Sequence, residues 1–517
     1  MRDPAPWQRK YENMALLSLL FGLWSQYLFV WNGLNLSVPL FVAAFYGLFF
    51  YAVKGRIGGF DQWKGQSKSG WLLSLPVVLL SLTYMIYANE LFRALNVILL
   101  PALIAAQTVL LTRSSGKPWY RAGFYGDVLL LSLFKPFSHI FVPFGLLANR
   151  LTPKNAVEQG MVGKAKRILF GLLLAAPLLG LVIGLLASAD RIFNELLWRI
   201  PRLLFHWDLF GGFIRTFVGA VFALYAFSYL WALLFRRIGD HQVGTHDTWN
   251  GLALVVYEEK AKTYKLDPLT ASTLLISFNL VYIVFAVIQF SYLFGASKGM
   301  LPAGSVYAEY ARQGFAQLIA VSLINLILLL CGLHLVKQGE RAAELVRKFS
   351  LSMLVGCTLV MLISAFGRLS LYEQVYGYTQ TRLLVHGFMI LLCFILAASI
   401  IRIWRSYFSL AKAYIALGLT AYIVMNYADL DGMIARQNSE RYEQNGKIDT
   451  RYLSHLSTDA LPALLKLQER HPRPIPNLED AIRSIRDQAP TGSGWPSWNL
   501  SKSRAAALEQ PGQASNG

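Results

Sequence analysis

Residues 269–296 read LTASTLLISFNLVYIVFAVIQFSYLFGA, a run of 28 residues without one charged side chain. A helix needs about 20 apolar residues to cross the hydrocarbon core of a bilayer. Only helices and closed barrels satisfy their backbone hydrogen bonds in lipid, so this run is predicted to be a transmembrane helix. Ten more stretches resemble it. The eleven predicted spans are residues 14–31, 37–53, 71–88, 94–112, 167–188, 214–235, 269–296, 313–336, 349–369, 383–403 and 408–428.

The composition agrees with a membrane protein. Hydrophobic residues make up 55% of the chain and charged residues only 15%, whereas soluble domains carry about 25% charge. The predicted fold class is an all-α polytopic membrane helix bundle of about 11 transmembrane helices, with a small extracytoplasmic helical tail. The net charge of +19 lies in short loops without a basic patch of stacking aromatics. We therefore expect membrane lipids, and no nucleic acid, as partners.

The loops between the spans differ in positive charge. Alternate loops, starting with the N-terminus, hold 28 Lys and Arg residues, whereas the other set holds 9. Positive loops stay in the cytoplasm. The charge pattern therefore predicts a cell-membrane protein with a cytoplasmic N-terminus and an extracytoplasmic C-terminus.

Two further segments are apolar but irregular. Residues 129–148 (LLLSLFKPFSHIFVPFGLLA) contain Lys135 and two prolines, and residues 191–207 (RIFNELLWRIPRLLFHW) alternate arginines with apolar and Trp positions. Both resemble interfacial or re-entrant segments. If both crossed the membrane instead, the two termini would keep their predicted sides, so this alternative stays open.

The composition changes abruptly after residue 428, where the apolar spans end. Residues 1–240 are predicted to form N-terminal membrane helices, and residues 241–428 the C-terminal ones. Residues 429–505 are predicted to be a short helical soluble tail, because polar sequence there surrounds helix starts such as Asn477 before LEDAIRSIRD. Residues 506–517 are predicted to be disordered. The tail would pack on the membrane part or bind a protein partner.

Ionisable and tyrosine side chains gather in loops on the predicted outer side. Arginine forks bind carboxylate or phosphate at two points, and tyrosine supplies an amphipathic wall with a hydroxyl. We therefore predict an outward-facing vestibule for an anionic or amphipathic small molecule or a lipid head group. The alternative is an aromatic belt with ion pairs between helices. The candidate residues are Tyr307, Glu309, Tyr310, Arg312, Arg368, Tyr372, Glu373, Tyr376, Tyr378, Arg382 and Asp429.

Known catalytic and cofactor motifs are missing from the sequence. It contains no phosphate loop, dinucleotide fingerprint, nucleophile elbow or zinc-protease motif. The three cysteines, Cys331, Cys357 and Cys393, lie in spans without metal-ligand spacing. We therefore expect no cofactor and no metal, and an enzyme is not favoured. A lipid-modifying enzyme that uses Glu373 or Asp429 is the third hypothesis.

Four motifs resemble a known family. They are YEEKAKTYKLDPLTASTLLISFNLVYIVFAVIQFSYLFG from residue 257, YAEYARQGFAQLIAVSLINLILLL from residue 307, GRLSLYEQVYGYTQTRL from residue 367 and ARQNSERYEQNGKIDTRYLSHLSTDALPAL from residue 435. Together they resemble the family known as domain of unknown function 4173, with its relative 4153, over about residues 250–505. The resemblance implies a bacterial cell-membrane protein and brings no substrate, cofactor or catalytic residue.

Two functions therefore compete. The first is transport or handling of a small molecule or lipid at the outer vestibule. The alternative is a membrane sensor or assembly component whose C-terminal tail binds a protein partner.

Overall fold

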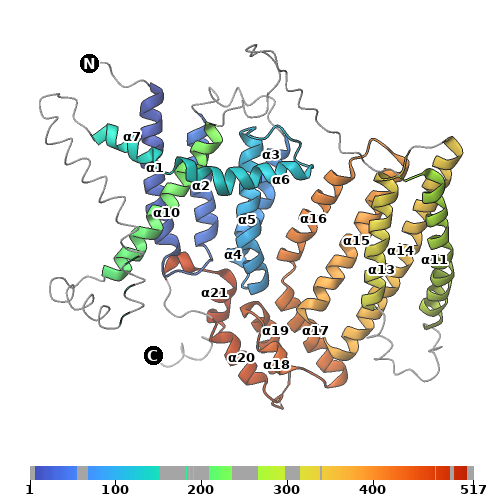
Figure 1. The fold of residues 1–517 in the computed structure, drawn as a ribbon. Coiled ribbons are helices and arrows are strands. Elements are labelled where there is room, and N and C mark those ends of the chain that lie inside the picture. The colour runs from blue at the N-terminus through green and yellow to red at the C-terminus, as the bar shows by residue number, and fades with distance from the viewer. Residues whose placement is uncertain are drawn as a thin grey trace, which may run out of the picture. The chain divides into compact units, whose positions relative to one another are not determined.

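The computed structural model describes residues 6–54, 68–151, 209–235, 266–296, 315–337, 340–471, 473–488 and 494–508, with single positions 182, 186 and 190. Every regular element in these residues is helical (Figure 1). One isolated bridge between Leu266 and Val336 is their only extended pairing. The predicted all-α class is therefore confirmed.

Contacts divide the chain into two compact units. The first comprises Met1–Tyr87, Arg93–Val243 and Pro490–Ser503, and the second comprises Ala88–Phe92, Gly244–Ala489 and Arg504–Gly517. The predicted boundary at residue 240 falls outside the described residues. Of the predicted tail, residues 490–503 are grouped with the first unit and the other residues with the second.

Most helices of the first unit precede those of the second along the chain, but residues 490–503 of the first unit follow them. The first unit contains α1 (Pro6–Phe29), α2 (Ser37–Lys54), α3 (Lys68–Leu72), α4 (Ser74–Ile86), α5 (Glu90–Leu111), α6 (Ala122–Leu129), α7 (Val142–Leu151) and α10 (Leu209–Leu234). The second contains α11 (Pro268–Ala296), α13 (Phe315–His334), α14 (Arg341–Tyr376), α15 (Gln380–Trp404), α16 (Leu410–Tyr427), α17 (Leu430–Asn445), α18 (Thr450–Leu453), α19 (Leu461–Arg470) and α20 (Leu478–Arg486). A short 3₁₀ turn (Trp495–Ser497) and α21 (Leu500–Ala507) follow.

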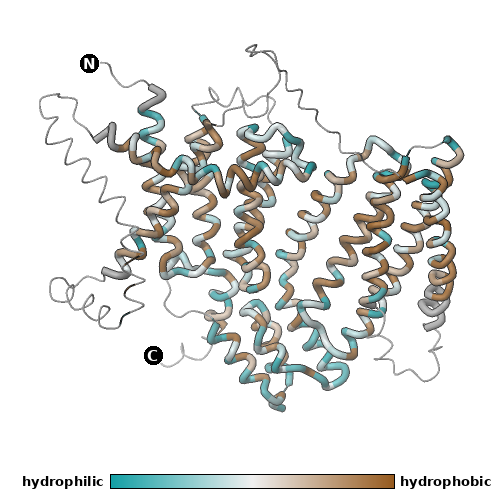
Figure 2. Tube along the Cα trace, in the orientation of Figure 1, coloured by the Kyte–Doolittle hydropathy of each residue, from teal (hydrophilic) through white to brown (hydrophobic). Residues whose placement is uncertain are grey.

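Eight helices of the described residues are long and apolar enough to cross a membrane, and a ninth is added if α16 and α17, bent by 60°, count as one span. They match nine of the predicted spans, and Figure 2 shows their apolar middles and polar ends. Predicted span 167–188 lies outside the described residues. The helix at predicted span 14–31, α1, has 24 residues but is less apolar than the others.

The structure extends one predicted span at both ends. Residues 349–369 were expected to cross, but α14 runs for 36 residues, about 54 Å at 1.5 Å per residue. Hydropathy detects only the apolar middle of this helix. The charged ends continue it beyond the hydrocarbon thickness, which is about 30 Å.

The segment at residues 129–148 is a series of short elements. A π-helical turn (Leu130–Phe134) and a 3₁₀ turn (Lys135–His139) separate α6 from α7. Pro136 begins one break, because proline cannot donate to a helix. None of these elements is long enough to cross a bilayer alone, and whether the segment lies at the interface stays a prediction. Residues 191–207 lie outside the described residues.

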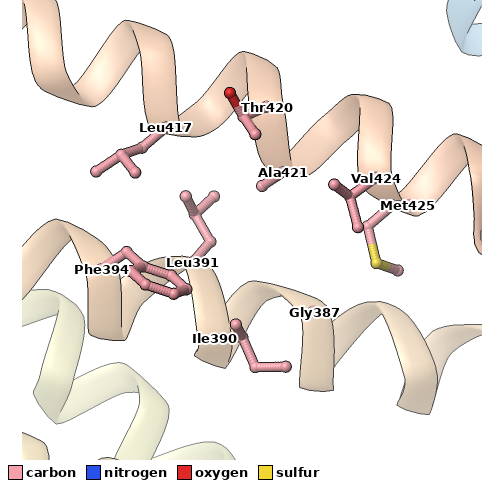
Figure 3. Close-up of a pocket in the computed structure, with 9 residues that line it drawn as sticks. All are labelled: Gly387, Ile390, Leu391, Phe394, Leu417, Thr420, Ala421, Val424 and Met425. Atoms are coloured by element: carbon pink, nitrogen blue, oxygen red, sulfur yellow. The ribbon is translucent and has the colours of Figure 1, made fainter.

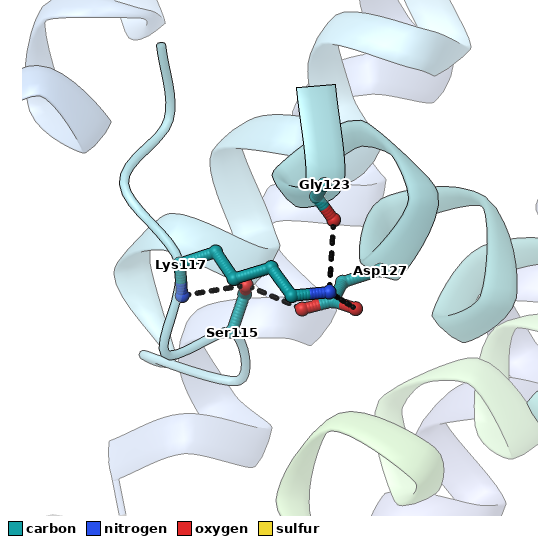
Figure 4. Close-up of polar contacts among 4 residues, drawn as sticks. All are labelled: Ser115, Lys117, Gly123 and Asp127. Carbon is teal, nitrogen blue, oxygen red and sulfur yellow. Dashed lines mark hydrogen bonds and ion pairs between the residues drawn. The ribbon is translucent and has the colours of Figure 1, made fainter. Parts of the chain in front are cut away.

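A loop before α6 is tied to that helix by an ion pair. The Lys117 ammonium lies 3.0 Å from the Asp127 carboxylate, and the Ser115 hydroxyl donates to the same group at 2.7 Å (Figure 4). Lys117 is about half exposed, so this pair contributes little stability, on the order of 1 kcal/mol or less. It positions the loop.

The second unit is built around α14. This helix contacts α11, α13 and α15, which run beside it in Figure 1. Two buried amides join the helices, since Asn279 Nδ2 donates to Ser350 O at 2.8 Å and Asn325 Nδ2 donates to Thr358 Oγ1 at 2.9 Å. Such bonds hold helices in register where water is absent. They hold α11 and α13 against α14, whose C-terminal end carries the candidate site.

Candidate functional site

The candidate site is built on the turn between α14 and α15. Gly377 ends α14 with φ 87° and ψ 168°, a region that is essentially restricted to glycine. Its N–H closes the helix by donating to Glu373 O at 2.7 Å. A Cβ at this position would lie 2.7 Å from the Asn438 side-chain oxygen. The turn therefore requires glycine for its backbone conformation and for the close approach of α17.

Arg441 of α17 fixes the end of α14. Its Nε donates to Gln374 O at 2.9 Å and its Nη2 donates to Val375 O at 2.5 Å. A third bond runs from Nη1 to Lys447 O at 3.0 Å. The last carbonyls of a helix have no partner within it. A buried guanidinium therefore caps α14 and ties α17 to it.

The turn itself is held by a side-chain amide. Asn438 Oδ1 accepts from Tyr378 N at 3.0 Å, and its Nδ2 donates to Tyr378 O at 2.9 Å. Burial raises the pKa of the Tyr378 phenol, with nearby Glu373 adding to the effect. The hydroxyl therefore stays protonated at neutral pH and can donate a hydrogen bond.

The start of α15 is attached to the tail. Gln380 N donates to Tyr452 Oη at 2.9 Å, and Gln380 Nε2 donates to Asp431 Oδ1 at 2.6 Å. The other Asp431 oxygen accepts from Ser457 N at 3.2 Å. Burial raises the pKa of Tyr452, so its hydroxyl also stays neutral. Tail residues thus hold both helix ends of the site.

Glu373 and His386 form a buried pair between α14 and α15. Glu373 Oε2 lies 2.9 Å from His386 Nε2, and the two side chains are 3% and 12% exposed. Glu373 Oε1 and His386 Nδ1 have no hydrogen-bond partner among the described residues. A buried polar atom without a partner costs about 1–3 kcal/mol. This pair is therefore the strongest sign of a binding site in the second unit.

Arg382 lies one helical turn before His386 on α15. Its guanidinium carbon lies 4.4 Å above the centre of the Tyr372 ring, and its Nη1 donates to Gly377 O. The Tyr372 and Tyr376 rings are 4.7 Å apart. A cation over an aromatic face is held in place by the ring quadrupole. Most of the Arg382 N–H groups remain without a partner among the described residues.

An apolar pocket of about 380 Å³ lies between α15 and α16 (Figure 3). Gly387, the residue after His386, lies at one end, and Phe394 lies farther along α15. Gly387 allows close packing there, since a Cβ would lie 2.6 Å from Met425 Sδ. Apart from Thr420, the side chains around the pocket are apolar. It suits a hydrocarbon group.

The predicted vestibule residues have different positions. Tyr372, Glu373 and Tyr376 share the last turns of α14, with Tyr378 and Arg382 immediately after. Arg368 lies earlier on α14 and is half-buried. Asp429 caps α17 instead, accepting from Gly432 N at 3.2 Å and lying 3.1 Å from Arg436 Nη1. Outside the described residues lie Tyr307, Glu309, Tyr310 and Arg312.

The candidate residues chosen from the sequence did not include all of this cluster. Glu373 was among them, but its partner His386, which lies within predicted span 383–403, was not. The spacing of Arg382 and His386, four residues apart, placed both on one helix face and was an available signal. Nothing local indicated Asn438 or Arg441, which lie 60 and 67 residues from their partners on the turn.

The chemistry of the cluster is acid–base and hydrogen bonding. It combines a guanidinium, a buried carboxylate, an imidazole and tyrosine hydroxyls. No group of three metal-ligating side chains occurs within the described part of the chain. Glu373 Oε1 and His386 Nδ1 can each accept a hydrogen bond, and the Arg382 guanidinium can bind an anionic oxygen.

Comparison with known proteins identifies a family and no activity. A family model described as "Domain of unknown function (DUF4153)" matches residues 74–467. The match is to the relative named above, and it begins well before the expected start near residue 250. Neither a curated protein nor a solved structure matches the chain.

Proposed function

We propose that this chain, which belongs to the DUF4153 family of unknown function, is an integral membrane protein that handles an amphipathic ligand at the α14–α15 turn. The ligand carries an anionic group and a hydrogen-bond donor, as many lipid head groups do. The Arg382 guanidinium binds the anionic group, and the Glu373 carboxylate accepts a hydrogen bond from the ligand's donor.

One observation carries the proposal. A carboxylate oxygen that is nine-tenths buried and has no partner among the described residues, Glu373 Oε1, lies beside an equally unpartnered imidazole nitrogen of His386. Buried polar atoms in native proteins are nearly always bonded. A donor from a ligand would remove the cost of leaving this oxygen unbonded.

The pocket between α15 and α16 supports an amphipathic ligand over a fully polar one. It begins at Gly387, adjacent in sequence to His386. Its apolar lining lies on α15, which is a candidate span, and on α16, which counts as one together with α17. Polar and apolar binding surfaces therefore lie on the same helix, α15.

We also propose a bacterial cell membrane as the location, with the N-terminus in the cytoplasm and residues 429–508 outside. The support is the excess of 28 over 9 positive residues in alternate loops and the positive-inside rule. On this orientation the ligand is reached from the outer side.

Lipids with and without a head-group donor test the proposal. Phosphatidylglycerol offers a phosphate and hydroxyl donors, whereas phosphatidylcholine offers a phosphate and a quaternary ammonium, which has no hydrogen-bond donor. A ligand at 100 times its Kd stabilises a protein by about 2.7 kcal/mol, or roughly 5–10 °C in Tm at about 2–4 °C per kcal/mol. We expect short-chain phosphatidylglycerol to raise the Tm of the detergent-purified protein by this amount, and phosphatidylcholine to raise it less.

Variants separate the two contacts. Glu373→Met together with His386→Phe removes the acceptor and leaves no unpaired imidazole, so the preference for phosphatidylglycerol should disappear. Arg382→Gln should weaken the response to both lipids. Glu443→Gln, at an exposed ion pair with Arg470, is the matched control. A paired variant that keeps the lipid preference would refute the proposal.

A protein partner through the tail is the second candidate. The apolar sides of α19 and α20 are buried in a shared cluster that includes Leu464, Leu467, Ile482 and Ile485. Those faces are therefore already used within the second unit, and a partner would have to bind the polar outer sides. Co-purification of a protein with the full chain, lost on substitution of exposed Glu479 and Arg483, would favour this candidate over lipid handling.

A further inference from the structure

The segment Trp495–Asn499, called the strap below, is bound to a loop of the first unit. Trp498 O accepts from Leu36 N at 3.1 Å, and Ser497 O accepts from Asn35 Nδ2 at 2.7 Å. Ser497 Oγ also accepts from Gly33 N at 3.0 Å. Most of these bonds use backbone atoms or buried side chains, so the strap has a defined position on the loop between α1 and α2.

A second loop binds the same strap. Asn499 Nδ2 donates to Tyr84 O at 2.9 Å and to Tyr87 O at 3.0 Å, and Asn499 is 2% exposed. The strap therefore contacts the end of α1, the start of α2 and the end of α4. Since α2 is a candidate span and α4 forms one together with α3, Lys68–Ile86, the ends of both lie close to a membrane surface. The strap must lie at that level too.

The exposed side of α1 changes character at the same level. Leu20 and Leu23 are 60% and 59% exposed, and they are followed by exposed Trp24, Tyr27 and Trp31. Leucine is favoured among lipid chains, whereas Trp and Tyr are enriched at the membrane–water interface. The end of α1 therefore marks the edge of the hydrocarbon layer.

The other end of α1 fits a crossing helix. Lys10 Nζ donates to Ala52 O at 2.7 Å, near the end of α2. The 19 residue steps from Lys10 to Phe29 span about 29 Å of helix, close to the hydrocarbon thickness of about 30 Å. A charged residue that caps a neighbouring span thus lies at one surface, and the aromatic residues lie at the other.

The strap adds Trp495 to this aromatic group and exposes a second indole, Trp498, nearby in sequence. The Trp495 ring lies 5.9 Å from the Tyr27 ring and 6.3 Å from the Trp24 ring, and Trp495 Nε1 donates to Tyr27 Oη at 2.7 Å. Trp495 and Trp498 remain 49% and 42% exposed. Exposing an indole ring to water leaves its large apolar area unburied. The head-group layer, in contrast, solvates the apolar ring and the polar N–H together.

We infer that the strap is an interfacial membrane anchor, which places Trp495 and Trp498 in the lipid head-group layer beside Trp24, Tyr27 and Trp31. The hydrophilic tail returns to the bilayer at this point. The anchor also requires the strap to share a membrane side with residues 30–36 and 87, which the charge count assigns to the outer side.

Quenching by brominated lipids tests the anchor in the full-length protein. The fluorescence of wild type minus that of the variant Trp495→Phe with Trp498→Phe isolates the two indoles. In nanodiscs, we expect bromines at acyl carbons 6 and 7 to quench this signal roughly twofold more than bromines at carbons 11 and 12, because interfacial Trp lies near the head groups. Aqueous iodide should quench it weakly.

Matched substitutions calibrate the measurement. Trp231, packed against the core of the first unit, should give a Trp231→Phe difference signal that responds weakly to every quencher. Trp495→Phe alone keeps the strap hydrogen bonds of Ser497 and Trp498, and it provides the test if the double variant does not fold. A signal that iodide quenches strongly and brominated lipids do not would overturn the anchor and indicate a surface for a soluble partner.

Discussion

The buried Arg441 guanidinium should be the largest single contributor to the order of the α14–α15 turn. Replacing Arg441 with Met removes three hydrogen bonds to carbonyl oxygens, at Gln374, Val375 and Lys447. At a net of about 1 kcal/mol for each bond, the variant should lose about 3 kcal/mol of stability. For a unit of this size, that loss corresponds to a Tm lower by roughly 6–12 °C.

Thermal unfolding in detergent, followed by a thiol-reactive dye, measures the global loss. Amide hydrogen exchange locates it, since the residues around Gly377 should lose protection before the rest of α14 does. Arg441→Lys keeps the charge but cannot bridge three carbonyls. It should therefore be destabilised nearly as much as the Met variant.

The control is Arg451→Gln, at an exposed position on α18, where the same loss of charge should change stability by less than about 0.5 kcal/mol. If Arg441→Lys were as stable as wild type, charge alone would explain the effect and the capping argument would be wrong. The same conclusion would follow if exchange at the turn were unchanged in the Met variant.

Two further predictions concern the turn and the orientation of the chain. Gly377→Ala should lower the free energy of unfolding by about 3 kcal/mol or more, because of backbone strain and a 2.7 Å contact of the new Cβ. Gly446→Ala, which has a positive φ but open space around it, should lower it by only about 1–2 kcal/mol. Equal losses in Tm would contradict the steric part of this argument. With the three native cysteines replaced, single cysteines at exposed Gln374 and Arg451 should react with an impermeant thiol reagent on intact cells, and one at exposed Ser406 should not. The inverse labelling pattern would place the site in the cytoplasm.

Prediction from sequence succeeded where the physical constraint is local. A helix in lipid must bond its own backbone and expose apolar side chains, so hydropathy finds it without knowledge of its neighbours. Nine of the eleven predicted spans are found this way. The prediction of α14 was too short because its charged ends are helical outside the apolar layer, where hydropathy carries no signal.

The candidate site was partly within reach of sequence. Tyr372, Glu373, Tyr376 and Arg382 lie within eleven residues of one another, and their clustering follows from chain proximity. Asp429 was placed with them because it ends the last span, but it caps α17 and pairs with Arg436. Asp431, two residues later, contacts the turn through Gln380 instead. Which of two nearby carboxylates reaches the site depends on the direction in which each side chain leaves the helix.

The sequence by itself determined that this chain is a polytopic helical membrane protein, where its apolar helices lie and which family it belongs to. Each of these properties can be recognised from short segments of sequence. Only the tertiary structure decided that Glu373 meets His386, that Arg441 caps α14 and that the tail is shared between the two units. Those contacts join residues 13, 67 and more than 400 positions apart. They depend on how helices pack, because a buried hydrogen bond forms only where packing brings its two partners together without water.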